Sequence, residues 1–436
     1  MSAAGERFLL AAYNGVYTKQ MSTHTATDMS VGYLTSVYPA LSHTFIFREI
    51  QVLRAHGVRI GTASIKRPDF IELMSSSEGH EYETTAYIQS TPAAEILLSH
   101  LRLFVRRPKG YLKALSYALS LRHKGTTPLH RLLGYFAEMA PLLAWMQSQK
   151  LNHLHIHFGN PAATVAMIAA ETGEVSFSMS IHGSDIFYDE SGNLLSEKIA
   201  KARFVRCISH FAQCQVMRHT PFPKWSKLHI VRCGIDPRVF QPRPVPANAV
   251  TQIVCVGRLI VAKGIFVLLQ ACRALREQGF EFHITLVGGG PEQGAIEAAA
   301  TELGIRDRLT ITGPVGQEDV HAYLDQADMM VLPSFAEGIP VVLMEAMAKE
   351  VFCISSRITG IPELIEDGLN GFLITPSDWM ELAQKMKVAL EDPALRARMG
   401  RKGRQTVLSK YDINKNAQNM GSLFAQYLAQ EGGTST

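Results

Sequence analysis

Several common features are missing from this sequence, and each absence narrows what the chain can be. Its 436 residues include six cysteines, none in a C-x-x-C pair, and several lie inside apolar stretches. We therefore expect free, buried thiols in a reducing compartment. No apolar run approaches the roughly 20 residues that a membrane-spanning helix needs. The formal net charge is only +4, so no nucleic-acid partner is expected.

The remaining composition is that of a folded protein. Hydrophobic residues make up 47% of the chain and charged residues 19%, which argues against disorder. No repeat of solenoid period and no low-complexity tract occurs. Residues 1–30 lack the continuous apolar stretch of a secretion signal, and Met21 and Met29 leave a later natural start open. We expect residues 1–30 to be a poorly ordered leader.

From residue 31 onward, short apolar segments alternate with helical spacing. A strand at Val31–Thr35, a helix at Thr44–His56 and a strand at Val58–Ile65 form a strand–helix–strand unit, the building block of a parallel sheet. Residues 92–150 carry helical patterns only and form an insert of about three helices. Further strands complete a first domain over residues 31–232; they are expected at 152–157, 175–181, 204–208 and 228–231.

A proline-rich linker over residues 233–250 separates this domain from a second one. Six further strands alternate with helices across residues 251–410, and residues 411–436 form a C-terminal helix and tail. The strands are expected at 252–256, 282–287, 308–312, 328–332, 351–355 and 371–374. This rhythm predicts an α/β fold of two Rossmann-like, doubly wound parallel-sheet domains facing across a cleft. Ligands bind such sheets beyond the carboxyl ends of their strands.

The strongest candidate site follows the expected strand at 328–332. Pro340 suits the first turn of a helix, so the backbone amides before it, near Gly338 and Ile339, are available for a diphosphate or sugar hydroxyls. Glu345 lies among apolar residues, and a buried carboxylate needs hydrogen-bond partners, which vicinal ribose hydroxyls would supply. Glu337 lies closer to the cleft and is a candidate to hold a sugar. The alternative is that both are structural, Glu337 as a cap and Glu345 bonded to local amides.

The second candidate site follows the expected strand at 252–256. Gly257 permits a sharp turn, after which Arg258 and Lys263 place two positive charges over the cleft, as in a clamp for a diphosphate. The alternative is a pair of solvated cations. Gly288 and Gly289 begin a glycine run after the next strand, which permits close approach of a ligand but equally fits a tight turn.

The first domain offers weaker candidates. His182 stands at a strand end before a glycine, where it can donate to a phosphate or sugar hydroxyl, although a lone histidine is more often structural. His153, His155 and His157 share one face of a strand; three imidazoles could bind zinc, but we favour packing for the first two and a position near the cleft for His157.

The loop after the first strand carries Ser42, His43 and Thr44. Ser42 or Thr44 can cap the next helix, and the amides of this loop would then face donor phosphates from the opposite domain. Simple capping is the alternative.

Helices over residues 92–124 combine many Arg and Lys residues with Leu, Phe and Tyr. Such a basic amphipathic region can lie on an anionic membrane, and a solvated helix face is the alternative. No D-x-D triplet occurs in the chain, which agrees with a site that uses no divalent metal ion.

These residues together resemble glycosyltransferase family 4. Glu337 and Glu345 match the E-x7-E motif of retaining enzymes with the GT-B fold, and Gly257-Arg258 with Lys263-Gly264 matches the family's phosphate-binding loop. The stretch Gly360-Ile361-Pro362-Glu363 matches another common segment. The first half resembles a bacterial exopolysaccharide subgroup that includes the colanic acid glycosyltransferases, through Tyr38 to Phe45, His155 to Phe158 and His182 to Ile186. The sequence departs from this pattern at His43, where the subgroup usually has Glu, and at Lys349-Glu350, where the family has a small residue and Gly.

The resemblance implies a retaining, metal-independent hexosyltransferase without a cofactor. Its donor would be a UDP- or GDP-linked sugar, and its acceptor a glycolipid or oligosaccharide in exopolysaccharide synthesis. It would act in the cytoplasm, with peripheral contact to the inner membrane through residues 92–124. His182, Glu337, Arg258 and Lys263 are the expected catalytic residues. Two alternatives stay open: a sugar-nucleotide epimerase or hydrolase of the same fold, and a non-catalytic two-lobed binding protein.

Overall fold

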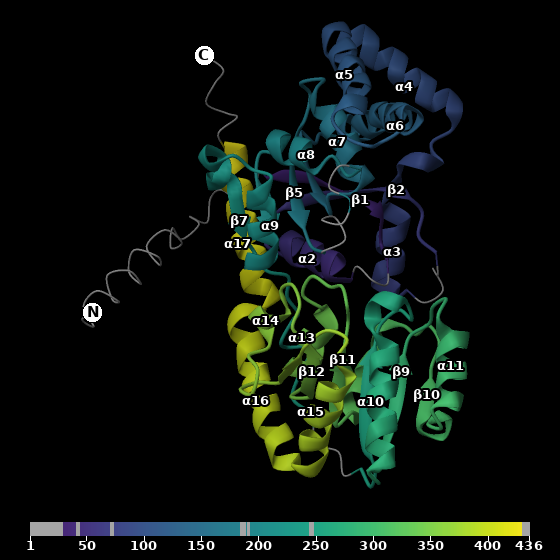
Figure 1. Cartoon of the computed structure of the whole chain (residues 1–436). Helices are drawn as coiled ribbons and strands as arrows, with labels where there is room; N and C mark the ends of the chain where they lie inside the picture. Colours follow the sequence, from purple (N-terminus) through teal and green to yellow (C-terminus); the bar gives the residue numbers. More distant parts are fainter. Residues whose placement is uncertain are drawn as a thin grey trace, which may run out of the picture.

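The chain forms two α/β domains, drawn one above the other in Figure 1. The computed structural model describes residues 29–40, 44–69, 74–183, 189, 192–243 and 248–429. Most of the expected leader, the candidates Ser42 and His43, and Pro244 and Pro246 of the linker lie outside these residues. None of the helices in the described part of the chain has the length and apolarity that crossing a bilayer requires.

Within the described residues, the N-terminal domain is built on a parallel sheet of seven strands in the order β3-β2-β1-β4-β5-β6-β7. The strands are β1 (Ser30–Val37), β2 (Arg59–Lys66), β3 (Ala86–Tyr87), β4 (His153–His157), β5 (Ser176–Ile181), β6 (Val205–Cys207) and β7 (Leu228–Ile230). The two-residue strand β3 was not predicted, because two residues are too few to show a period.

Helices connect these strands and form the predicted insert. The connecting helices are α2 (Thr44–Ala55), α3 (Ser76–Thr84), α7 (Pro161–Ala170), α8 (Leu195–Lys201) and α9 (His210–Arg218). The insert consists of α4 (Ala93–Arg106), α5 (Pro108–Ser120) and α6 (Leu129–Ser148), as predicted from the breaks at Pro108, Gly125 and Pro128. Short 3-10 turns lie at η4 (Ile88–Ser90), η5 (Leu121–His123) and η7 (Phe222–Lys227).

The C-terminal domain has a parallel sheet whose six described strands are ordered β10-β9-β8-β11-β12-β13. They are β8 (Thr251–Val256), β9 (Phe282–Val287), β10 (Leu309–Ile311), β11 (Met329–Leu332), β12 (Phe352–Ser356) and β13 (Phe372–Ile374). The helices are α10 (Ile265–Glu277), α11 (Gln293–Glu302), α12 (Gln317–Gln326), α13 (Val341–Ala348), α14 (Ile361–Leu364), α15 (Trp379–Glu391) and α16 (Pro393–Lys410), with turns η8 (Val261–Lys263) and η9 (Arg306–Arg308). All six strands were predicted within a residue or so of their ends.

The last helix, α17 (Ile413–Leu428), returns to the N-terminal domain, as its position in Figure 1 shows. Its buried Met420 and Phe424 share a core with Val31 and Tyr33 of β1 and with α2. The chain therefore crosses between the domains twice. The two crossing segments bond to each other, because Ile235 exchanges backbone hydrogen bonds with the segment at Tyr411 to Ile413.

Two smaller expectations need correction. All six cysteines are free, as expected, but Cys214 is exposed on α9 rather than buried. Pro340 was expected in the first turn of α13, but it is the N-cap residue of that helix. Its missing N–H costs no helical hydrogen bond in either position.

Candidate active site

The strand order of the C-terminal sheet locates its binding edge. After β8 the chain moves outward to β9 and β10, and then returns to place β11 on the other side of β8. The direction of winding therefore switches between β8 and β11, and ligands of doubly wound sheets bind at this point. The loops that leave these two strands, residues 257–264 and 333–340, contain both of the strongest sequence candidates.

Backbone contacts hold the two loops together. The N–H of Phe335 donates to the carbonyl oxygen of Ala262 at 2.8 Å. Gly264 has a φ of +63°, and a Cβ atom there would lie 2.0 Å from the carbonyl oxygen of Pro333. Any larger residue at this position would separate the loops. The close contact between the two candidate loops thus requires glycine at position 264.

The contact between the loops places Lys263 against Glu337. The Lys263 Nζ atom lies 2.5 Å from Glu337 Oε1, and the hydroxyl of Ser334 donates to the same oxygen at 2.9 Å. The two side chains are 20% and 12% exposed, so this ion pair lies at the edge of the fold and remains reachable. Arg258, on the same loop as Lys263, is exposed. The two loops therefore carry two cations and one carboxylate at the edge where the sheet switches direction, and Lys263 and Glu337 are in contact there.

The glycine run after β9 serves packing between loops. A Cβ atom on Gly288 would lie 2.2 Å from the carbonyl oxygen of Gly257, and one on Gly290 would lie 2.3 Å from that of Leu259. The N–H of Leu259 donates to the carbonyl oxygen of Gly289 at 2.9 Å. These glycines hold the loop that carries Arg258, and their role toward a ligand stays a prediction.

Glu345 is buried on α13, as its apolar surroundings predict. Its Oε1 atom lies 2.8 Å from Nη1 of Arg48 and accepts a hydrogen bond from Gln317 at 3.0 Å. Burial raises the pKa of Glu345, and the Arg48 guanidinium opposes that rise. Arg48 belongs to α2 of the other domain, so this carboxylate is held partly across the interface between the domains.

The start of α13 touches the N-terminal domain. A Cβ atom on Gly338 would lie 1.8 Å from the carbonyl oxygen of His182, so only glycine permits this contact. On the other side, the hydroxyl of Thr359 and the N–H of Gly360 donate to the carbonyl oxygen of Gly338 at 3.1 and 3.2 Å. The residue next to Glu337 is therefore fixed by both domains.

A second bridge between the domains is made by Glu363. Its two carboxylate oxygens accept from the N–H of Phe211 and from Nη2 of Arg232, each at 3.1 Å. Both partners belong to the N-terminal half of the chain. The candidate site thus lies between two domains that are already in contact through charged groups.

The comparisons with known proteins agree with this geometry. Residues 242–406 match the model of the family described as glycosyl transferases group 1. The C-terminal domain of this chain is therefore a group 1 glycosyltransferase domain. It is 27% identical over 372 residues to a protein named for colanic acid biosynthesis, the glycosyltransferase WcaL of Escherichia coli K12, covering 82% of this chain and 90% of that one. It is 38% identical over 164 residues to the amylovoran biosynthesis glycosyltransferase AmsK of Erwinia amylovora, covering 36% and 40%.

Solved structures share the two-domain fold of this chain. Sucrose-phosphate synthase from Thermosynechococcus elongatus superposes with a TM-score of 0.71 at 19% identity, covering 92% of this chain and all of that one. HepE from Anabaena, solved in complex with UDP, gives 0.69 at 17% identity, covering 91% and all of that chain. The predicted architecture of two facing parallel-sheet domains is confirmed.

In the N-terminal domain, the alternating histidines of β4 pair with the alternating serines of β5. His153 bonds to Ser176 and Ser178 at 2.8 and 2.9 Å, and His155 bonds to Ser178 and Ser180 at 2.8 and 2.7 Å. Burial lowers the pKa of His153 to about 3, so its imidazole is neutral. These two residues are structural, as expected.

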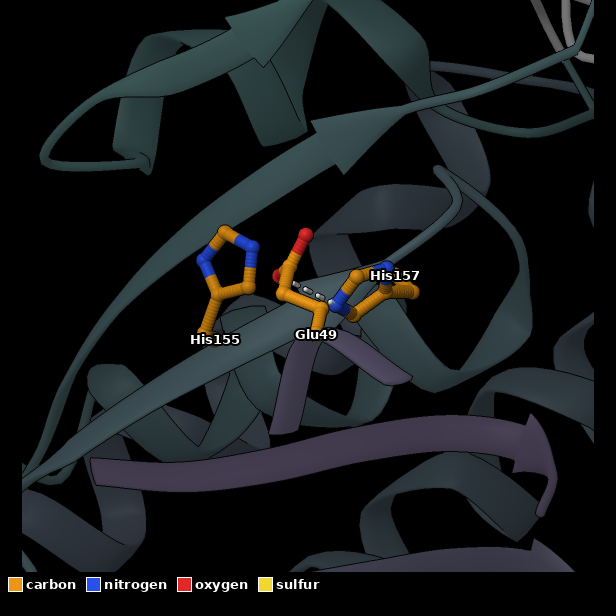
Figure 2. Close-up of side chains that lie close together, drawn as sticks. All are labelled: Glu49, His155 and His157. Carbon is orange, nitrogen blue, oxygen red and sulfur yellow. Dashed lines mark ion pairs between the residues drawn. The ribbon is translucent and has the colours of Figure 1, made fainter. Parts of the chain in front are cut away.

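His157 belongs to a different cluster, shown in Figure 2 together with Glu49 and His155. The ligand atoms of these three residues lie within 4.8 Å of one another, close enough to suggest a metal site. Protein groups already bind two of the three, however: Glu49 binds Arg206 at 2.5 Å and accepts from Tyr33 at 3.0 Å, and both nitrogens of His155 have serine partners. We assign the cluster to structure.

His182 connects that cluster to the domain interface. Its Nε2 atom lies 2.8 Å from Nδ1 of His157, and its Nδ1 atom lies 3.4 Å from Sγ of Cys233. Both nitrogens thus face protein atoms, while the backbone carbonyl faces Gly338. His157 is fully buried behind it. A ligand could reach His157 only past His182. His157 therefore lies deeper in the domain than the position near the cleft that the sequence predicted.

Sequence reasoning did not foresee the role of Arg48. It lies in a helix with ordinary amphipathic spacing, and only its distance from Glu345 in space reveals the pair. Thr44 is the first residue of that helix and is almost buried. Glu363 was noted as part of a family motif, but its bridge to Phe211 and Arg232 has no local sequence signal.

Proposed function

We propose that this chain is a retaining, metal-independent hexosyltransferase that takes a sugar from a UDP- or GDP-linked donor. The observation that carries the proposal is the Lys263–Glu337 pair at the switch point of a group 1 glycosyltransferase domain. A cation placed beside a carboxylate matches a sugar diphosphate, which offers negative oxygens at one end and hydroxyl groups at the other. The two cations of this loop would neutralise the leaving phosphate without a metal ion or a cofactor.

In this proposal the donor lies along the carboxyl edge of the C-terminal sheet. Lys263 and Arg258 bind the diphosphate, and Glu337 with the amides near Gly338 and Ile339 orients the sugar. Glu345 accepts the ribose hydroxyls, sharing its carboxylate with Arg48. The acceptor hydroxyl attacks the anomeric carbon on the face that the nucleotide leaves. The bond to the nucleotide breaks, and its phosphate takes the acceptor's proton, so the configuration is retained.

The relatives support a proposal for the acceptor and the location. The proteins named for colanic acid and amylovoran biosynthesis support an acceptor of the same kind, a glycolipid or oligosaccharide of a bacterial exopolysaccharide. HepE was solved with UDP, which supports a nucleoside-diphosphate donor. The enzyme would work in the cytoplasm, in peripheral contact with the inner membrane. Ser42, His43, Thr44 and His157 stay the candidates predicted from the sequence for contact with the acceptor or the phosphates, although Ser42 and His43 lie outside the described residues.

Transfer by a purified Glu337→Ala variant tests the proposal. Thermal shift against a panel of nucleotide sugars identifies the donor first, because a ligand that binds the folded state raises its melting temperature. Loss of the sugar-orienting carboxylate should lower turnover by about 100-fold or more. Glu391→Ala, at the exposed end of α15, is the matched control and should keep wild-type turnover.

Wild-type turnover by Glu337→Ala would remove that residue from the mechanism. The same assay separates the alternatives. Nucleotide release without an acceptor, or an epimerised donor, would identify an epimerase or hydrolase. Donor binding without turnover across the acceptor panel would identify a binding protein. A product with inverted anomeric configuration, read by proton NMR, would contradict retention alone.

A further inference from the structure

Helix α4 exposes an unusually apolar face. Leu97, Leu101, Phe104 and Val105 are 72%, 57%, 42% and 73% exposed, and Leu98 beside them is 40% exposed. Their spacing places all five on one side of the helix. The opposite side, with the buried Leu103, packs on α6. Single exposed leucines are ordinary. Five exposed apolar side chains on one 14-residue helix form a contiguous apolar surface, which is typical of a binding surface.

The neighbouring helix α5 adds further exposed apolar side chains. It packs against α4 and exposes Leu112 and Leu119, which are 54% and 39% exposed. Figure 1 shows α4 and α5 at the outer end of the N-terminal domain, away from the C-terminal domain. A broad partner can therefore reach this face without touching the Lys263–Glu337 site. We call the exposed side chains of α4 and α5 named here the apolar face.

Basic residues border the apolar face. Residues 92–124 contain seven Lys and Arg residues and a single acidic residue, Glu95. Some of this charge is paired within the protein, because Arg106 and Arg107 share Glu174, Lys113 binds Glu171 and Lys124 binds Glu197. Arg102 and Lys109 are exposed, and neither has an acidic partner within 4.0 Å among the residues that the structure describes. The border therefore keeps a positive charge.

A small groove opens beside this border. It lies between α4 and α6, has a volume of about 230 Å³ and is lined by Arg102, Arg106, Leu103 and Leu143 among others. Arg106 is fixed there by its two hydrogen bonds to Glu174. The groove thus combines apolar walls with guanidinium groups, the surroundings that suit a phosphate joined to an acyl chain.

We propose that the apolar face and its basic border dock this protein on an anionic lipid bilayer. The apolar side chains of α4 and α5 would enter the boundary between head groups and acyl chains, and Arg102 and Lys109 would meet lipid phosphates. A second copy of the chain fits less well, because a symmetric contact through this face would bring one positive border against another. The inference deepens the proposed function, since a bilayer would present a lipid-linked acceptor.

Sedimentation of the full-length chain with vesicles tests the proposal. We compare vesicles of phosphatidylethanolamine and phosphatidylglycerol with vesicles of phosphatidylcholine alone. The wild-type chain should bind the anionic vesicles, and Leu97→Glu with Val105→Glu should weaken binding by about tenfold or more. Arg102→Gln with Lys109→Gln should weaken binding to anionic vesicles by about tenfold and leave binding to neutral vesicles unchanged.

A matched control comes from α15. Met380→Glu with Val388→Glu introduces two carboxylates on an exposed helix of the other domain, with the same spacing of eight residues as Leu97→Glu with Val105→Glu. This control variant should bind vesicles like wild type. Circular dichroism confirms that each variant is folded. Wild-type vesicle binding by the Leu97/Val105 variant would overturn the proposal. Light scattering that finds a dimer in wild type and a monomer in this variant would assign the face to a second copy instead.

Vesicle binding does not require turnover. A chain that binds anionic vesicles through this face but transfers no sugar would overturn the proposed function and leave the docking surface standing. The reverse result, transfer to a soluble acceptor without vesicle binding, would overturn the docking surface alone.

Discussion

At the residue scale, the two glutamates of the E-x7-E spacing lie in different environments. Glu337 lies near the surface beside a lysine and a serine hydroxyl. Glu345 is buried, and the side chains that bind its carboxylate among the described residues are those of Arg48 and Gln317, both on the same oxygen. Its second oxygen is therefore the better candidate for a ligand hydroxyl. The carboxylate of Glu337, near the surface, is placed to contact a sugar. The buried carboxylate of Glu345 is suited to act as a fixed hydrogen-bond acceptor.

The raised pKa of Glu345 predicts a pH-dependent effect on stability. An unfolded chain has a glutamate pKa of about 4.3, and burial raises the folded value above it. The carboxyl therefore contributes stability fully below the unfolded pKa and loses that contribution as pH rises through the folded pKa. Glu345→Gln does not titrate. Its melting temperature relative to wild type should rise between about pH 4 and pH 7.

Thermal unfolding at several pH values, with Glu391→Gln as the exposed control, checks this prediction. The difference in melting temperature between Glu345→Gln and wild type could instead stay constant or fall as pH rises. That result would show that burial does not raise the pKa of Glu345.

At the scale of elements, α13 ends in a strained turn. The N–H groups of Glu350 and Val351 donate to the carbonyl oxygens of Met347 and Ala346, the hydrogen bonds of a Schellman motif. Glu350 adopts a φ of +63° there, a conformation that favours glycine. The sequence departure at Lys349-Glu350 thus has a local structural cost, and it lies at the end of α13 away from Gly338.

Glu350→Gly should therefore stabilise the protein by about 1 kcal/mol. Chemical unfolding measures the change. Glu297→Gly, inside α11, is the control and should destabilise by about 1 kcal/mol, because there glycine replaces a better helix former. If both substitutions destabilised the protein, the turn at Glu350 would not be strained.

The elements themselves were largely predictable from the sequence, because buried parallel strands and their helices leave strong periodic patterns. Short β3 left none. The C-terminal helix was predicted, but its return to pack on α2 was not, since contacts between residues hundreds of positions apart have no local pattern. In the site, loop residues such as Lys263 and Glu337 were predicted because glycine and proline mark those turns. Arg48 was missed because its partner lies in the other domain.

At the scale of the whole molecule, the site depends on how the two domains meet. Two crossing segments bond to each other at Ile235, and Arg48, Glu363 and Gly338 each contact the opposite domain. The Gly338 contact leaves no room for a Cβ atom and lies next to Glu337. Small shifts between the domains would therefore change the position of the carboxylate that is proposed to orient the sugar.

Gly338→Ala tests this dependence. Its new methyl group would overlap the carbonyl oxygen of His182, so the domains must move apart, and we expect kcat/KM for the donor to fall by about tenfold or more. Gly294→Ala, on α11 with open space around it, is the control and should leave kcat/KM unchanged. Equal activity of the two variants would show that the contact is not needed for transfer.

Calorimetric titration with UDP and GDP tests the central claim most directly, namely that the loops after β8 and β11 hold a nucleoside diphosphate. Wild type should bind at least one of the two. Lys263→Ala should bind it about tenfold or more weakly, because a charge-assisted contact to phosphate is lost. Lys385→Ala, whose lysine pairs with Asp367 elsewhere in the domain, should bind like wild type. Equal affinities for all three proteins, or no binding of either nucleotide by wild type, would contradict the account.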